Sequence, residues 1–321
     1  MEFNDILKAV ERVEGYVTKT ELRECSSINK MVNKEIYFKC ENFQQTGSFK
    51  ARGALNSIKK HLGSGFVKGV TTHSSGNHGF ALAWAASLHN LPCIVVVPSN
   101  TPQYKKDIIV SHGAQIIEVE NTLEARKNKC NEIAELKEFL IVDPHNDYDV
   151  MAGQGTLGYE ILQQNPETEA ILVATGGGGV SSGISKFVKH NNKNVKVFMV
   201  EPEGKELQKS IDAKARIVTE NVPLVNTIAD GIRVPIADKC FIEVLKNCES
   251  TVLTVNNMEI KNAMKIIFEH MKMIVEPTGA VCMAALFKYK DSFLKDIKNI
   301  TILICGGNVA IESTDLTNTS N

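Results

Sequence analysis

Lys50 is the residue of this sequence whose position best suits covalent chemistry. It closes a short, polar, glycine-containing turn within Glu41–Arg52 (ENFQQTGSFKAR), and a helical pattern begins directly after it. The apolar residues of that pattern recur at helical spacing: Ala54, Leu55, Ile58 and Leu62. A lysine shielded at a helix N-terminus loses proton affinity, because burial and the helix dipole both disfavour its charge, and a neutral amine can form a Schiff base. The alternative is an ordinary solvated lysine, which these residues alone favour because surface lysines are common.

A glycine run further along the chain predicts a phosphate site. The apolar segment Ala170–Thr175 reads as a strand and leads into Gly176, Gly177, Gly178 and Gly179, after which a helical pattern begins. Bare backbone can wrap its N–H groups around an anion, and the helix adds the positive end of its dipole. The loop lacks the Gly-Lys-Ser/Thr of a P-loop and departs from GxGxxG spacing, which disfavours a dinucleotide. A dinucleotide stays open because Glu201 ends the next strand, where an acidic ribose ligand is expected. A close-packed turn without a ligand is the weakest alternative.

An activated lysine and a phosphate loop together predict pyridoxal phosphate, a cofactor held through an imine, its phosphate and its ring nitrogen. Cys305 is a candidate for the third contact. It ends an apolar strand predicted for Ile300–Cys305 and precedes Gly306, Gly307 and Asn308. Cys305 is therefore expected at the carboxyl edge of a sheet, where ligands bind in open α/β folds.

Alternating strand and helix patterns place these residues in an α/β fold with doubly wound parallel sheets. One unit is predicted between Gly69 and Val142, and the alternation resumes from Val150. Strands are predicted at Glu35–Cys40, Gly69–His73, Cys93–Val97, Ala114–Val119, Phe139–Val142, Ala170–Ala174, Val195–Val200, Thr251–Val255 and Ile300–Cys305. A helix is predicted over Met258–Met271, and the tail from Ser313 is predicted to be disordered.

The composition excludes several classes of partner. The 321 residues carry a formal net charge of −1 and no block of like charges, which provides no field for nucleic acid or an anionic membrane. No apolar run approaches the length of a membrane span. The eight cysteines lack paired CxxC spacing and read as reduced thiols, so a cytoplasmic protein is expected. Its expected partners are small molecules and copies of itself.

The order and spacing of several motifs resemble the fold type II pyridoxal-phosphate enzymes, and within them the serine racemase and serine/threonine dehydratase group. The motifs span nearly the whole chain: ENFQQTGSFKARGA, HSSGNHG, AGQGT, TGGGGVSSG, EPTGA and CGGNV. The resemblance implies a two-domain fold of the tryptophan synthase β type, with a small domain at residues 69–147 and a large domain at residues 1–68 and 148–321. It also implies a homodimer.

The same resemblance assigns roles to single residues. Lys50 resembles the lysine that holds the cofactor as a Schiff base, and Phe49 resembles the residue beside its ring. Asn77 resembles the ligand of the cofactor's 3-hydroxyl group, and Cys305 the contact of the pyridine nitrogen. Gly176 to Gly179 resemble the phosphate site. The remaining matches concern the substrate carboxylate, which the loop residues Ser74, Ser75, Asn77 and His78 would hold with Arg126 as a further contact.

The implied activity is racemisation of serine together with its dehydration to pyruvate and ammonia. Lys50 would remove the α-proton as a general base, and Ser75 would be the acid on the opposite face. Ser75 matches the residue with this role in eukaryotic serine racemases, whereas threonine dehydratases tend to carry alanine there. The alternative for Ser75 is a purely structural role, as a turn hydroxyl that caps the next helix. Cys305 stands where racemases usually have a serine and is closer to the serine dehydratases, which slightly favours elimination over racemisation.

Two other functions share much of this pattern. An ammonia-lyase for threonine or 3-hydroxyaspartate without racemase activity would carry every motif above. A non-catalytic metabolite-binding module is the second alternative, and Lys50, Ser75 and Asn77 together argue against it, because binding alone does not need the lysine.

The resemblance also implies a divalent cation, Mg²⁺ or Ca²⁺, but the set of ligands for it is incomplete in this sequence. Eukaryotic serine racemases hold one near a sequence like Glu201-Pro202, with a second carboxylate six residues after the glutamate, where this chain has Leu207. Because hard cations require several oxygen ligands, Glu201 would need the Lys205 carbonyl and waters, or Glu206, to complete a metal site.

Overall fold

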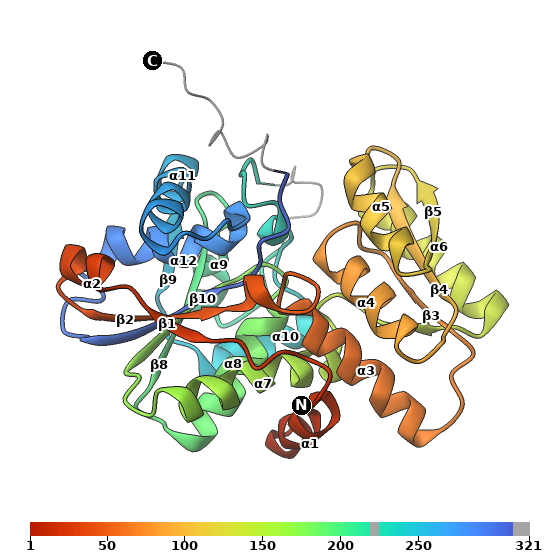
Figure 1. Ribbon diagram of the computed structural model, residues 1–321, viewed down its shortest axis with the longest axis horizontal. Helices are drawn as coiled ribbons and strands as arrows, with labels where there is room; N and C mark the ends of the chain where they lie inside the picture. The colour runs from red at the N-terminus through yellow and green to blue at the C-terminus, as the bar shows by residue number, and fades with distance from the viewer. Residues whose placement is uncertain (219–224, 311–321) are drawn as a thin grey trace.

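Buried apolar runs form the strands of two sheets, and helices cover both faces of each (Figure 1). The computed structural model describes residues 1–218 and 225–310, so the predicted disordered tail lies outside the described residues. The α/β fold predicted from the sequence is confirmed. Strands such as β4, whose six residues CIVVVP are all buried, are apolar throughout because both faces of a parallel sheet are covered.

The larger sheet has six strands within the described residues, in the order β1-β2-β10-β7-β8-β9. Only β1 runs antiparallel to its neighbour, and the other pairs are parallel. The strands are β1 (Leu22–Glu24), β2 (Glu35–Cys40), β7 (Ala170–Ala174), β8 (Lys196–Pro202), β9 (Val252–Val255) and β10 (Asn299–Ile304). The neighbouring strands β2 and β10 are paired from Glu35 opposite Asn299 to Cys40 opposite Ile304, so strands from the two ends of the chain lie side by side.

The smaller sheet is parallel throughout, in the order β5-β4-β3-β6. Its strands are β3 (Val70–Thr72), β4 (Cys93–Pro98), β5 (Gln115–Val119) and β6 (Leu140–Ile141). The helices of the described chain are α1 (Phe3–Val13), α2 (Ser26–Val32), α3 (Lys50–Ser64), α4 (Asn77–Ser87), α5 (Gln103–Ser111), α6 (Leu123–Lys137), α7 (Tyr148–Gln164), α8 (Gly179–Asn191), α9 (Leu207–Ala213), α10 (Asp238–Asn247), α11 (Asn257–Ile266) and α12 (Pro277–Tyr289), with short turns at η1 (Glu41–Phe43), η2 (Asp230–Ile232) and η3 (Ile267–Met271).

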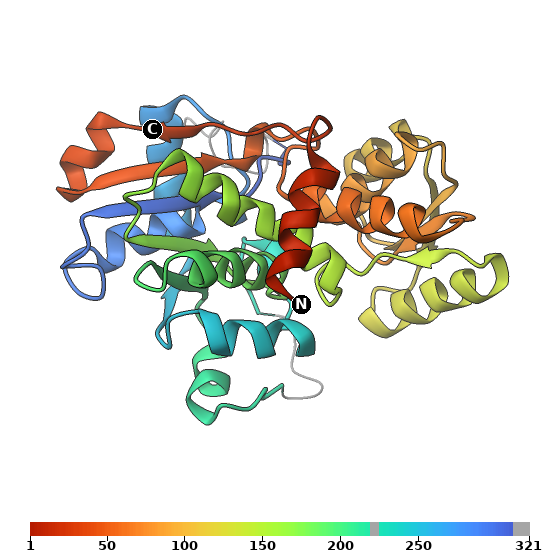
Figure 2. The same cartoon turned by 90° about the horizontal axis from the view of Figure 1, so that it is seen from below.

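The helices divide between the faces by their apolar sides. On the larger sheet, α2, α11 and α12 pack on one face and α7 and α8 on the other. On the smaller sheet, α3 and α4 cover one face and α6 the other. The N-terminal helix α1, drawn in red in Figure 2, packs through Ile6 and Ala9 against α7 and α8.

Helix α3 links the two halves of the molecule. Its apolar side joins the cluster of the smaller sheet, while a Cβ built on Gly53 would lie 2.7 Å from the Val150 carbonyl oxygen of α7. This close approach explains why glycine stands at that position of α3. Lys50 at the start of α3 is thereby held between the two sheets.

Several elements differ from the sequence prediction. The segment Met258–Met271, predicted as one helix, is an α-helix that ends at Ile266 and continues as the π-helical turn η3. The short elements β1, α2, α9 and α10 had no prediction. They are short or lie at an edge, so their apolar pattern is too brief to be distinctive.

Candidate active site

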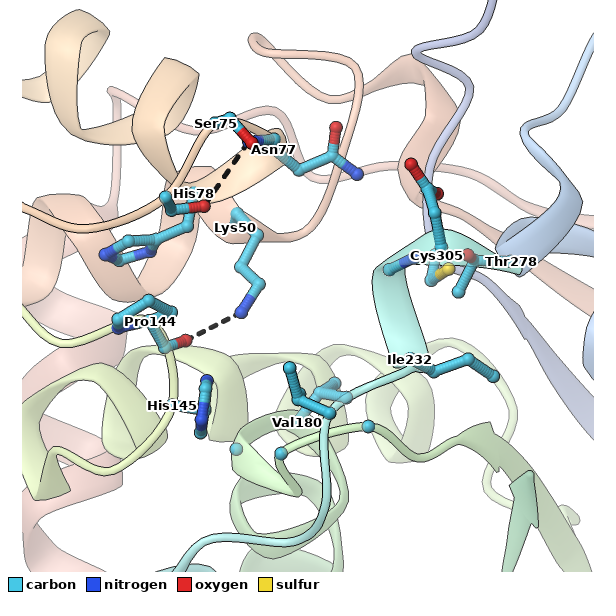
Figure 3. Close-up of a pocket in the computed structure, with 18 of the residues that line it drawn as sticks. Lys50, Ser75, Asn77, His78, Pro144, His145, Val180, Ile232, Thr278 and Cys305 are labelled. Atoms are coloured by element: carbon cyan, nitrogen blue, oxygen red, sulfur yellow. Dashed lines mark hydrogen bonds between the residues drawn. The ribbon is translucent and has the colours of Figure 1, made fainter. Parts of the chain in front are cut away.

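A cavity of about 240 Å³ lies where the two sheets meet (Figure 3). Loops that follow the carboxyl ends of β3, β7 and β10 contribute its walls, as expected for open parallel sheets. In Figure 3, Lys50 extends toward Pro144, Ser75 and Asn77 lie above it, and Cys305 lies across the cavity from Lys50. The site residues predicted from the sequence that line it are Phe49, Lys50, Ser74, Ser75, Asn77, His78, Arg126, Gly176, Gly177, Gly178, Gly179 and Cys305.

Lys50 is a buried amine with a lowered proton affinity. Burial lowers the pKa of Lys50 to about 8, although the carboxylate of Asp143 acts in the opposite direction. Its Nζ donates to the Pro144 carbonyl oxygen at 2.6 Å and lies 5.3 Å from the centre of the Phe49 ring. The turn before it is fixed to the end of β10, because the Phe49 N–H donates to the Cys305 carbonyl at 3.2 Å. A buried amine with a lowered pKa is suited to Schiff-base chemistry.

A buried ionic network anchors the first turn of α3 two residues after Lys50. The Arg52 side chain is fully buried and donates to both oxygens of Glu41, at 2.8 and 2.7 Å, and to Glu160 at 2.6 and 3.0 Å. Lys39 pairs with the same Glu160 at 2.5 Å. The sequence analysis missed this network, because its members lie on β2, η1, α3 and α7 and only the fold brings them together.

The glycine loop offers free N–H groups to the cavity. In the described part of the chain, none of the N–H groups of Gly176 to Gly179 donates a turn or loop hydrogen bond. Gly178 has φ +92°, and a Cβ there would lie 2.8 Å from the Cys240 Cβ. At Gly176, a Cβ would lie 2.9 Å from the Ile232 Cα. Side chains are therefore excluded from this loop, and the start of α8 adds its positive dipole end.

A hydrogen-bonded chain occupies the wall next to Asn77. The Asn77 amide donates to the two oxygens of Glu276 at 2.9 and 3.1 Å, and the Asn308 amide donates to the Asn77 oxygen at 2.9 Å. Burial raises the pKa of Glu276 to about 7, against the Asn77 hydrogen bond. The Cys305 Sγ lies 4.0 Å from Glu276, and burial raises the pKa of that thiol well above its ordinary value. Cys305 is thus a neutral thiol at physiological pH.

The predicted substrate loop lies at the start of α4, and its side chains point in different ways. The Ser74 Oγ accepts from the Gly76 N–H at 3.4 Å, while the Ser75 hydroxyl makes no hydrogen bond to another described residue. The His78 ring turns away to the Val142 carbonyl, with Nε2 at 3.0 Å, and burial lowers the pKa of His78 to about 3. A neutral ring that donates to a carbonyl suits a structural role. Arg126, whose pKa burial lowers, reaches the His73 carbonyl at 3.5 Å.

A second polar cluster, absent from the site residues predicted from the sequence, flanks Lys50. Asp143 accepts from the backbone N–H groups of His145 and Asn146 at 3.0 and 2.7 Å, and the His73 ring lies 3.4 Å from its other oxygen. Burial alone would raise the pKa of Asp143, but these contacts bring it below its usual range. Burial lowers the pKa of His145 to about 4. Glu276 and Asn308 were also not predicted as site residues. Pro277, at the start of α12, marks the beginning of a helix directly after Glu276, and this signal could have identified Glu276.

Glu201, the predicted metal ligand, lies outside this cavity. It is fully buried near the end of β8, where its Oε1 accepts from the Leu207 N–H at 2.7 Å and its Oε2 lies 3.5 Å from the Lys205 Nζ. Across residues 1–218 and 225–310, no group of three or more metal-ligating side chains is assembled. The same residues contain no helix with both the length and the apolar character needed to cross a membrane.

Comparison with known proteins gives consistent matches over nearly the whole chain. The family described as "Pyridoxal-phosphate dependent enzyme" matches residues 13–306. A serine racemase from Dictyostelium discoideum is 40% identical over 311 residues, which cover 96% of this chain and 95% of the relative. A beta-hydroxyaspartate dehydratase from Paracoccus denitrificans is 35% identical and covers 97% of each chain. The crystal structure of a pyridoxal 5'-phosphate-dependent aspartate racemase superposes with a TM-score of 0.94 at 39% identity, covering 98% of each chain.

The cavity fits the cofactor that this family uses. It contains a primary amine with a lowered pKa, a loop of free N–H groups at a helix start and a neutral thiol at a strand end, which are the three contacts that pyridoxal phosphate requires. The match extends over both sheets and all of these elements. The chain therefore belongs to the pyridoxal-phosphate dependent enzymes.

Proposed function

We propose that this enzyme interconverts L-serine and D-serine and also converts serine to pyruvate and ammonia. The observation that carries the proposal is that Lys50 and Ser75 line the same cavity, one a weakly basic amine and the other a hydroxyl without a partner among the described residues. The relative from Dictyostelium discoideum, a serine racemase, supports the choice of substrate.

The proposed binding roles follow from the contacts of each side chain. Lys50 would hold the cofactor covalently, with Phe49 beside its ring, Asn77 at its 3-hydroxyl, the Gly176 to Gly179 N–H groups on its phosphate and Cys305 at its ring nitrogen. When bound, pyridoxal phosphate supplies electron withdrawal from the α-carbon, which the neutral Cys305 thiol keeps weaker than a carboxylate would. The hydroxyls of Ser74 and Ser75 and the start of α4 would hold the substrate carboxylate, with Arg126 near it.

The proposed chemistry depends on two proton carriers. Lys50, neutral in part of the molecules at physiological pH, accepts the α-proton from one face of the substrate. Ser75 donates a proton to the other face, and the two roles exchange for the reverse reaction. Elimination needs no proton on the other face: Lys50 accepts the α-proton and passes it to the β-hydroxyl, which leaves as water, and the released enamine hydrolyses to pyruvate and ammonia.

Ser75→Ala separates the two activities. With L-serine and added pyridoxal phosphate, the wild-type protein is expected to form D-serine and pyruvate in one time course. Ser75→Ala is expected to lower D-serine formation at least about 100-fold while pyruvate formation stays within about tenfold, because only racemisation needs the second proton carrier. Chiral chromatography and a coupled pyruvate assay measure both products.

Two further variants frame this experiment. Lys50→Ala is expected to lose both products. Ser87→Ala, at the far end of α4, which begins two residues after Ser75, is expected to lose neither. Formation of pyruvate without D-serine by the wild-type protein would contradict the racemase assignment and leave a dehydratase.

A second candidate function is an ammonia-lyase for 3-hydroxyaspartate or threonine without racemase activity. The dehydratase from Paracoccus denitrificans, at 35% identity, favours the first of these substrates. Comparing kcat/KM for serine, threonine and 3-hydroxyaspartate separates the candidates. A preference of about 100-fold for 3-hydroxyaspartate would replace serine as the substrate.

We also propose a cytoplasmic homodimer in which residues 69–147 form a small domain against a large domain of residues 1–68 and 148–321. All eight cysteines are free thiols, which supports a reducing compartment. The strands of the smaller sheet all fall between Val70 and Ile141, which supports the division.

A further inference from the structure

Lys205 places a buried ammonium group behind the glycine loop. It lies between β8 and α9, and its side chain is only 4% exposed, which is unusual for a lysine. Its Nζ donates to the carbonyl oxygens of Thr175 at 2.5 Å and Gly176 at 3.1 Å. These carbonyls belong to the first two residues of the loop that lines the cavity.

Glu201 supplies the matching negative charge. Its Oε2 lies 3.5 Å from the Lys205 Nζ and has no hydrogen-bond partner among the described residues, while its Oε1 accepts from the Leu207 N–H. The 3.5 Å between the Lys205 Nζ and the Glu201 Oε2 lies within the distance of an ion pair, and both side chains are buried. Lys205 is therefore the charged partner of a buried ion pair.

The oxygens around Lys205 do not fit a divalent cation. Glu206, the alternative carboxylate, pairs with the exposed Lys209 at 2.8 Å and is itself 56% exposed. Leu207 contributes only an N–H group, which occupies Glu201 Oε1. The remaining oxygens of Glu201, Thr175 and Gly176 surround the ammonium group. A hard cation needs about six oxygen ligands, and this pocket is occupied by a covalently attached charge.

We propose that the ammonium group of Lys205 is a built-in cation that takes the place of the dissociable Mg²⁺ or Ca²⁺ expected at Glu201. It acts as a positioning residue for the phosphate loop. In each trans peptide unit the C=O and the following N–H point in opposite directions. Fixing the Thr175 and Gly176 carbonyls on Lys205 therefore turns the N–H groups of Gly176 and Gly177 away from Lys205, and both glycines line the cavity. This inference rests on the proposed role of the glycine loop as the phosphate site.

The first test is the metal dependence of cofactor binding. Apo-protein is titrated with pyridoxal phosphate, followed by its absorbance and fluorescence, in buffer with EDTA, with MgCl₂ or with CaCl₂. The Kd of the wild-type protein is expected to agree within about twofold in all three buffers, since the cation cannot dissociate. A Kd that rises at least about tenfold in EDTA and returns with MgCl₂ or CaCl₂ would overturn the proposal.

The second test removes the ammonium group and then supplies it again. Lys205→Ala is expected to raise the Kd for pyridoxal phosphate at least about tenfold, and methylammonium chloride is expected to recover part of this loss, because it can enter the vacated space beside Glu201. Tetramethylammonium chloride at the same ionic strength should not, because it has no N–H donors. Lys209→Ala, which removes an exposed lysine of α9, is the matched control and should bind like the wild type. Wild-type affinity in Lys205→Ala, or equal recovery by both salts, would overturn the proposal.

A double variant covers the case in which Lys205→Ala does not fold. Lys205→Met with Glu201→Gln removes both charges and leaves no buried carboxylate unpaired. It is expected to fold, to bind pyridoxal phosphate at least about tenfold more weakly and to show no recovery with methylammonium, and wild-type affinity in this variant would also overturn the proposal. All of these measurements use cofactor binding without substrate. If the enzyme does not act on serine, the binding results still test the role of Lys205. If the binding results overturn the role of Lys205, the products formed from serine still test the proposed activity.

Discussion

At the scale of single residues, burial shifts the pKa values of the site groups in opposite directions. Lys50 is moved toward the neutral amine, while Glu276 and Cys305 are moved toward their neutral acids. Removing water disfavours the charged form of each group, whatever its sign. Each of these three groups therefore carries less charge than it would in water, which suits proton transfer within the cavity.

Glu276 should make the stability of the apo-protein depend on pH. Its pKa is about 7 when folded, against an ordinary value of 4.5. Between these values the folded chain keeps a proton that the unfolded chain releases, so this contribution to stability is complete below the ordinary pKa and is lost as pH rises through about 7. Glu276→Gln, which stays neutral, is expected to gain up to about 3 kcal/mol in unfolding free energy relative to wild type between about pH 5 and pH 8.

Urea unfolding of both apo-proteins across this pH range measures the effect. Glu132→Gln, an exposed position on α6, is the control and should follow the wild-type curve. Parallel curves for Glu276→Gln and wild type would show that Glu276 is ionised throughout.

At the scale of elements, α3 is fixed at its start by charge and along its length by close packing. The Arg52 network holds the first turn against β2 and α7, and Gly53 lets α7 approach the α3 backbone. Lys50 gains its orientation mainly from this anchoring, since its Nζ hydrogen-bonds only to the Pro144 carbonyl among the described residues.

Removing the Arg52 charge should destabilise the whole fold. Arg52→Met leaves Glu41 and Glu160 buried with one cation, Lys39, between them, and an uncompensated buried charge costs about 3–5 kcal/mol. We expect a loss of that size in the unfolding free energy from urea titration. Arg23→Met, which breaks the exposed pair with Glu21, is the control and should cost less than about 1 kcal/mol. An equal, small loss in both variants would mean that the network does not anchor α3.

At the scale of the whole molecule, the cavity exists because two sheets meet. β3 lies in the smaller sheet and β7 and β10 in the larger, so the loop at Ser74 and the loops at Gly176 and Cys305 face one another only in the folded chain. A change in the position of one sheet relative to the other would therefore move Ser75 relative to Lys50.

A homodimer is the expected assembly. Sedimentation equilibrium should give twice the 35.3 kDa of one chain at micromolar concentration, with or without pyridoxal phosphate. A mass that remains at one chain over the whole concentration range would contradict this expectation. Lys209→Ala, which removes only an exposed ion pair, is the control and should give the same mass as the wild-type protein.

The sequence by itself determined the α/β class, the family and a part of the cavity lining, because these depend on local order. Strand and helix periods, the glycine run and the motifs around Lys50 and Ser75 are all contiguous in the chain. The tertiary structure decided which distant groups meet. Arg52 meets Glu160, Asn77 meets Glu276, and the side chain of Lys205, considered from the sequence only for its carbonyl, reaches the carbonyls of Thr175 and Gly176. Burial and partner choice set the charge of each group, and neither can be read from residue type or spacing, because both depend on which elements pack together.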